Sequence, residues 1–121
     1  ITASGASSVA DGSTSEDASL TMTFTSDEAT TDFAVSDISV ANATLSNFSA
    51  TSSTVYTATL TPTAQGAVTV NVAASTFNDA AGNDNTAATE FNWSYDSIAP
   101  TMTITASGAS SVADGSTSED A

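Results

Sequence analysis

The side chains of this chain that could do chemistry are almost all carboxylates and amides. Among 121 residues there are 14 Asp and Glu but no Lys, Arg, His or Cys, which gives a formal net charge of −14. This set lacks the usual nucleophile and base of a catalytic site, and only a glycosidase-like carboxylate pair is conceivable. We therefore expect no enzymatic activity. Carboxylate and amide oxygens are instead the ligands that Ca²⁺ prefers in proteins.

Six of the 14 acidic residues lie in two predicted loops, at 26–32 and 73–89, and at the start of a linker at 96–100. Acidic segments that meet without a basic residue would repel one another, and a bound Ca²⁺ would turn that repulsion into a rigid joint. The same residue types are also common in turns, because Asp and Asn tolerate turn geometry and bind backbone amides. The candidate calcium ligands are Asp27, Glu28, Asp79, Asn83, Asp84 and Asp96, with Asp32 and Asn85 beside them.

The composition also excludes two classes of partner. Without Lys or Arg the chain cannot neutralise the phosphates of nucleic acid or an anionic membrane surface. A hydrophobic content of 40% argues against a disordered acidic tail, so the chain should fold. An acidic chain rich in Ser and Thr and free of Cys suits an extracellular bacterial protein.

Four stretches alternate apolar and polar residues with a period of two, which predicts β-strands at 20–25, 55–60, 67–72 and 91–95. Shorter strand segments are expected at 33–35 and 38–40, an edge strand within 42–50, and a long polar loop at 4–19. Phe77 should plug the core beneath the second acidic loop. About seven short strands in roughly 100 residues indicate an all-β, immunoglobulin-like antiparallel sandwich. The predicted core is Leu20, Met22, Phe24, Tyr56, Ala58, Leu60, Val68, Val70, Val72, Phe91, Trp93 and Tyr95.

One segment occurs twice. Residues 1–18 and 104–121 are identical, at an offset of 104 − 1 = 103 residues. We expect a tandem array with this period, in which 1–97 is one repeat with a truncated first strand. Residues 98–121 would then be the linker, first strand and first loop of the next repeat, so that both ends of the chain fall inside a repeat.

Four motifs carry a family resemblance: TFTSDE at 23–28, YTATLTP at 56–62, DAAGN at 79–83 and DSIAP at 96–100. Together they make the chain similar to the bacterial immunoglobulin-like repeats of large secreted or surface-anchored proteins, including adhesins and biofilm-associated proteins. The resemblance implies a β-sandwich that acts as a spacer in an extracellular fibre, without catalysis. The absence of basic residues departs from that family and fits a salt-rich source.

In an immunoglobulin-like topology the two acidic loops lie at one end of the sandwich, where the linker of a preceding repeat, carrying the equivalent of Asp96, would enter. We therefore predict a structural extender whose partners are neighbouring repeats, rigidified by Ca²⁺. The alternative is an adhesive or filament-forming module that exchanges strands between copies, because 101–105 has no domain of its own to join. Exposed and disordered Met102 and Ile104 would contradict this alternative.

Overall fold

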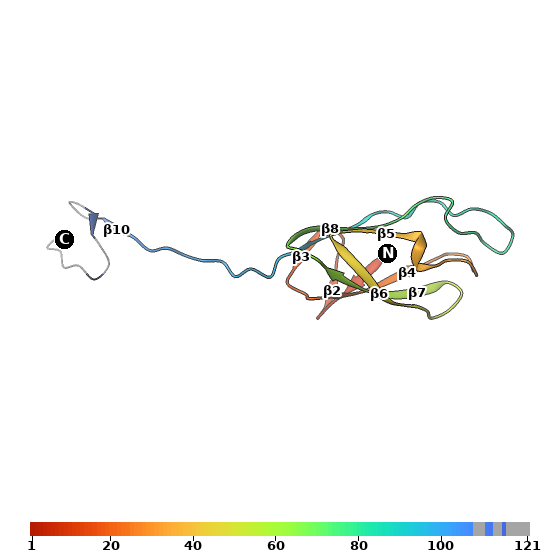
Figure 1. Cartoon of the computed structure of the whole chain (residues 1–121), viewed down its shortest axis with the longest axis horizontal. Coiled ribbons are helices and arrows are strands. Elements are labelled where there is room, and N and C mark those ends of the chain that lie inside the picture. Colours follow the sequence, from red (N-terminus) through yellow and green to blue (C-terminus); the bar gives the residue numbers. More distant parts are fainter. Residues whose placement is uncertain (108–110, 113–114, 116–121) are drawn as a thin grey trace.

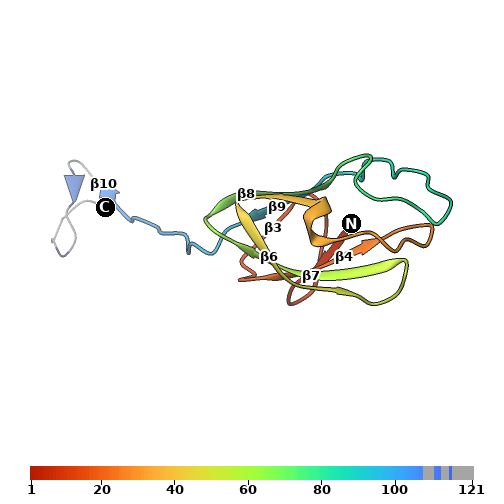
Figure 2. The same ribbon diagram turned by 45° about the vertical axis from the view of Figure 1, so that its right-hand side comes forward.

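The computed structural model describes residues 1–107, 111, 112 and 115, so the loop predicted for the second copy lies mainly outside the described residues. Two sheets face each other as a sandwich (Figures 1 and 2). The first has the order β2-β1-β4-β7-β6 and the second the order β3-β9-β8-β5. The strands are β1 (Thr2–Ser4), β2 (Ser8–Val9), β3 (Ser13–Ser15), β4 (Leu20–Thr25), β5 (Ile38–Ala41), β6 (Ala43–Ala50), β7 (Val55–Pro62), β8 (Gly66–Val72) and β9 (Phe91–Tyr95), with a 3-10 helix η1 (Val35–Asp37).

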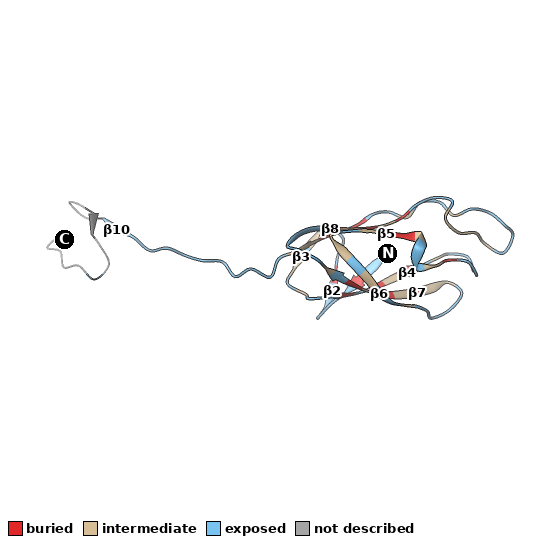
Figure 3. Cartoon of the chain, viewed as in Figure 1, coloured by how far each residue is buried: buried red, intermediate tan, exposed pale blue. Residues whose placement is uncertain are grey.

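The core lies between the sheets, and the alternating strands bury their apolar side chains there. Figure 3 marks the buried positions along the ribbon. Of the predicted core residues, Tyr95 is half-buried and the other eleven are buried. Trp93 is 2% exposed, and its indole N–H donates a hydrogen bond of 3.0 Å to the Ser15 hydroxyl. The period-two pattern therefore predicted the interior correctly, and the immunoglobulin-like sandwich is confirmed.

The polar segment 4–19 was wrongly predicted as one long loop. It contains β2, which pairs with β1, and β3, which runs parallel to β9. These strands are two and three residues long and carry mostly Ser and Thr. Strands this short show no recognisable alternation, and they form because a neighbouring sheet edge offers unpaired backbone groups.

The strand expected at 33–35 was also wrong. Phe33 lies in an irregular segment, and Val35 begins η1. The Asp37 carboxylate accepts a hydrogen bond of 2.8 Å from the backbone N–H of Ala34. This side-chain bond offers the backbone an alternative to the sheet ladder, which explains the turn.

The second copy of the duplicated sequence repeats the pairing of the first. In the first copy Ala3 pairs with Val9 and Ser4 with Ser8. In the second, β10 (Ala106–Ser107) and β11 (Ser111–Val112) pair Ala106 with Val112 and Ser107 with Ser111. Each position is shifted by 103 residues, so the same hairpin forms without the sandwich beside it.

The chain leaves the sandwich at the end opposite the two acidic loops (Figures 1 and 2). The exit is fixed by Ser97, whose backbone N–H donates a bond of 2.8 Å to the Gln65 side chain. Beyond it, Met102 is 86% and Ile104 is 89% exposed, in a segment that belongs to no strand. Met102 and Ile104 therefore add nothing to the core of their own chain.

Substitution at Leu60 tests the core. Leu60 is fully buried in β7, so Leu60→Ala should lower the free energy of unfolding by about 2–5 kcal/mol. Thr61→Ala, on the exposed face of the same strand, should change it by less than about 1 kcal/mol. Equal effects of the two substitutions in denaturant titrations would contradict the assignment of the β7 faces.

Candidate functional site

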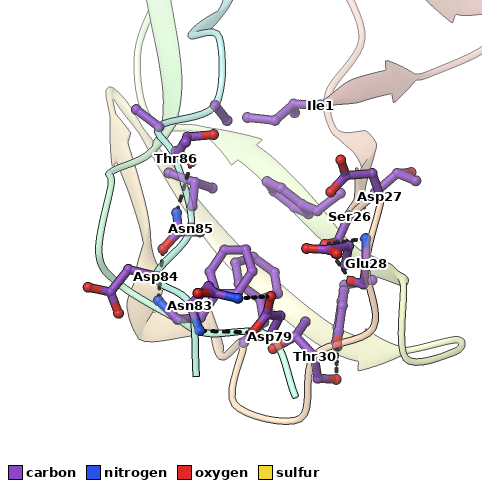
Figure 4. A pocket seen from close by; sticks show the side chains of 18 residues that line it. Ile1, Ser26, Asp27, Glu28, Thr30, Asp79, Asn83, Asp84, Asn85 and Thr86 are labelled. Atoms are coloured by element: carbon purple, nitrogen blue, oxygen red, sulfur yellow. Dashed lines mark hydrogen bonds between the residues drawn. The ribbon is translucent and has the colours of Figure 1, made fainter. Parts of the chain in front are cut away.

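The two acidic loops meet over a cavity of about 490 Å³ at one end of the sandwich (Figure 4). One loop joins β4 to Phe33, and the other joins β8 to β9. Five of the six predicted ligands line this cavity, so the expectation that the two loops share one end of the sandwich is confirmed. They are Asp27, Glu28, Asp79, Asn83 and Asp84.

Asp96, the sixth predicted ligand, does not reach the cavity of its own chain. Its backbone N–H donates a hydrogen bond of 3.0 Å to the Ser15 carbonyl, at the exit of the chain from β9. Its carboxylate accepts a bond of 3.1 Å from the backbone N–H of Ile98. Asp96 therefore lies at the far end, and only the linker of another copy would bring an equivalent carboxylate to the cavity.

Asp79 organises the DAAGN turn. Its carboxylate accepts bonds from the backbone N–H groups of Ala81 and Asn83, at 2.9 and 2.8 Å, and from the Asn83 side-chain amide at 3.0 Å. Gly82 takes a left-handed conformation with φ of 88°, which glycine adopts without steric cost. The Asn83 side chain, then its backbone N–H, hold the pKa of Asp79 below its usual range. The motif is thus a self-closed turn.

Asp32 joins the two acidic loops. Its carboxylate accepts bonds of 3.0 and 3.2 Å from the backbone N–H of Asn78 and a bond of 2.8 Å from the Thr30 hydroxyl. The Asn78 N–H, followed by the Thr30 hydroxyl, lowers the pKa of Asp32. Thr30 is itself 4% exposed, and its carbonyl accepts a 3.0 Å bond from the Tyr56 hydroxyl. Asp32 therefore fixes the position of one acidic loop against the other.

Asn85 holds the second loop together from inside. Its side-chain oxygen accepts bonds from the backbone N–H groups of Thr76 and Phe77 at 2.8 and 3.0 Å. Its amide group donates to the carbonyls of Ala73 and Thr86 at 2.9 and 3.0 Å. Both the oxygen and the nitrogen of the Asn85 side chain are hydrogen-bonded within the loop, so the role of this side chain is structural.

The floor of the cavity is aromatic, a feature that the polar residues of the two loops did not indicate. The ring centroid of Phe33 lies 4.9 Å from that of Tyr56 and 5.0 Å from that of Phe77, both in edge-to-face geometry. Ile1, Phe24 and Val72 add to the apolar lining. The expected plug at Phe77 is confirmed, and it was the one sequence signal of this floor.

One chain supplies only part of the oxygen ligands that a bound cation would need. Glu28 and Asp79 come from different loops and line the same cavity. No group of three or more Asp and Glu side chains comes together to hold a metal ion among the residues described. Since Ca²⁺ takes about six to eight oxygen ligands, further donors would have to come from another copy or from water.

The hydrogen bonds of Asp32 predict a dependence on pH. A carboxylate whose pKa is lower in the folded state contributes stability above its unfolded pKa and loses it as pH falls through the folded pKa. Asp32→Asn should therefore lower the melting temperature at neutral pH and bring it to the wild-type value in acid.

Asp27→Asn is the matched control for this prediction. It removes the same charge at the same end of the sandwich, from a carboxylate that accepts no hydrogen bond from the described residues. It should leave the melting temperature unchanged or raise it at neutral pH, because the chain carries a net charge of −14. Thermal melts of both variants and the wild type at several pH values give the melting temperature as a function of pH. If the two variants show the same pH dependence, Asp32 does not have the proposed role.

A family model described as a bacterial Ig-like domain matches residues 2–95. Comparisons with curated proteins and with solved structures found no significant match. Domains of this family are typically structural and non-enzymatic, and they commonly occur in surface proteins. The only helix among the described residues is η1, which at three residues is too short to cross a bilayer. The matched segment covers the whole sandwich from β1 to β9, and the chain therefore belongs to the bacterial Ig-like domain family.

Proposed function

We propose that this chain is a structural extender, one unit of a tandem array that holds another part of a large extracellular protein away from a bacterial cell. The observation that carries the proposal is the placement of the two chain ends. Ile1 lies at the cavity between the acidic loops, and the linker leaves from the opposite end of the sandwich (Figures 1 and 4). Units joined in this way add length to an array.

The repeated hairpin supports a head-to-tail order of units. β10 and β11 reproduce the pairing of β1 and β2 at an offset of 103 residues. The linker between them contains Pro100, whose fixed φ limits the flexibility of the connection. A surface with no Lys or Arg also offers trypsin-like proteases no cleavage site, which suits a position outside the cell.

Small-angle scattering from tandem proteins of one, two and three repeats tests the extender. The maximum dimension should rise by the same increment with each added repeat, and the proteins should remain monomeric. Replacing Ile98–Pro100 with Gly-Ser-Gly should shorten the longest dimension, because a Gly and Ser linker is flexible. Compact particles whose dimension does not grow with repeat number would overturn the extender function.

We further propose that Ca²⁺ stiffens the joint between repeats, with ligands from both acidic loops and from the Asp96 carboxylate of the preceding copy. The support is that Glu28 and Asp79, from the two acidic loops, line one cavity at the end of the sandwich where that linker would enter. Asp79 is already bonded within its turn, so it would offer Ca²⁺ only its remaining lone pairs. The linker of a second copy is therefore needed to complete the ligand set.

Thermal unfolding of a two-repeat protein, with Ca²⁺ and with a chelator, checks this proposal. A ligand that binds only the folded state adds about 2.7 kcal/mol at a free concentration one hundred times its Kd. Ca²⁺ should raise the melting temperature, and Glu28→Ala with Asp79→Ala should abolish the rise. Glu16→Ala, which removes an exposed acid far from the cavity, should preserve it. Identical melts with Ca²⁺ and chelator would exclude calcium from the joint.

A second candidate function is an adhesive or filament-forming module. The condition set against it is met only in part, because Met102 and Ile104 are exposed but lie among the residues that the structure describes. The candidate is favoured by their large apolar side chains, which the described part of the chain leaves uncovered. Exposed apolar side chains favour association with another copy.

A further inference from the structure

The cavity between the acidic loops lies where β1 would continue if it began earlier. Its apolar lining includes Ile1, Phe24, Phe33 and Phe77, and its volume is about 490 Å³. Ile1 packs against the core, immediately before β1. A strand that extended past Ile1 toward its N-terminal side would therefore enter this cavity.

The register of β1 on β4 determines which residues of such an extended strand would lie in the cavity. Thr2 pairs with Thr23 and Ala3 with Met22, in antiparallel order. Continuing that register sets Ile1 opposite Phe24, the residue before it opposite Thr25, and the next opposite Ser26. Because side chains alternate along a strand, the residue opposite Ser26 shares the inward face of Ile1 and Ala3. Phe24 and Ser26 both line the cavity, so this side chain would point into it.

The second copy of the duplicated sequence supplies a residue suited to this position. In it, Ile104 is preceded by Thr101, Met102 and Thr103, so the residue two places before Ile104 is Met102. Met102 is 86% exposed in its own chain. A methionine side chain is flexible and polarisable, and it packs well against aromatic rings in irregular spaces.

We propose that the cavity is a docking site for a second copy of this chain, whose segment 101–107 pairs with β4 in place of Ile1–Ser4 and inserts Met102. The exchange costs few contacts, because Ile104–Ala121 repeats Ile1–Ala18 residue for residue. The incoming β10 and β11 also have the pairing that β1 and β2 have. What is gained is the burial of Met102 in the cavity and the pairing of Thr103 with Thr25 at the end of β4.

The donor strand comes from another copy because a chain presents its own segment at the wrong end. The linker leaves beside Gln65, at the end of the sandwich opposite the acidic loops (Figure 2). Copies would therefore join head to tail, which is the order of a tandem array. The inference goes beyond the extender function and does not rest on it, since it names the segment that closes the sandwich and the cavity that receives it.

Disulfide trapping tests the docking, since the chain has no cysteine of its own. In the proposed register Thr103 of the donor lies opposite Thr25 of the acceptor, within reach of a disulfide. We expect chains carrying Thr103→Cys and Thr25→Cys, mixed in high salt to screen their charges, to form crosslinked heterodimers at least about fivefold faster than a mixture of Thr105→Cys and Thr25→Cys. Thr105 is equally exposed and lies two residues out of register.

The insertion of Met102 is tested in the same assay. Met102→Asp in the donor should remove the enrichment, because a carboxylate would enter an aromatic cavity, whereas Thr105→Asp should preserve it. Both positions are exposed in the free chain, so neither change should disturb folding. Equal crosslinking of the two cysteine pairs, including none in either, would overturn the docking, and enrichment that survives Met102→Asp would overturn the role of the cavity. Scattering from covalent arrays tests the extender function separately.

Discussion

Every carboxylate in this structure must be stabilised without a basic side chain, and the loops follow from that constraint. With 14 acids and no Lys, Arg or His, the available donors are backbone N–H groups, hydroxyls and side-chain amides. Charge-assisted bonds to these donors are stronger than neutral ones, so a carboxylate that gathers several of them fixes the backbone around it. The carboxylates that accept backbone N–H groups in this way are Asp11, Asp17, Asp32, Asp37, Asp79 and Asp96.

This constraint bears on the two interpretations of the acidic loops, as a calcium site or as turns whose carboxylates bind backbone amides. Asp79 and Asp32 have structural roles within one chain, as turn former and loop connector, so their presence needs no metal to explain it. Asp27 and Glu28 have no comparable role, although both line the cavity. The case for a cation therefore depends on Asp27 and Glu28, on the lone pairs that Asp79 has left and on a linker that another copy would supply.

The interior was predictable because each long strand alternates without interruption. Leu20, Met22 and Phe24 in β4, for example, are all buried as the period of two requires. The short strands β2 and β3 were not predictable, since they exist only through pairing with β1 and β9. The immunoglobulin-like topology predicted from the sequence placed the cavity-lining acids at one end of the sandwich. Of the aromatic floor the sequence indicated Phe77 alone, because Phe33 and Phe77 lie outside regular strands and meet only in the folded chain.

The strand docking and the calcium joint would act at the same place, and their order follows from the chemistry. The linker that carries Asp96 precedes Thr101 directly, so a strand seated on β4 would deliver that carboxylate to the acidic end. Two chains of charge −14 repel each other until salt or a cation screens them. An apolar anchor such as Met102 does not depend on charge, and it would hold the joint closed while the carboxylates around it recruit cations. The apolar contact would then determine the register of the joint, and the cation would determine its stiffness.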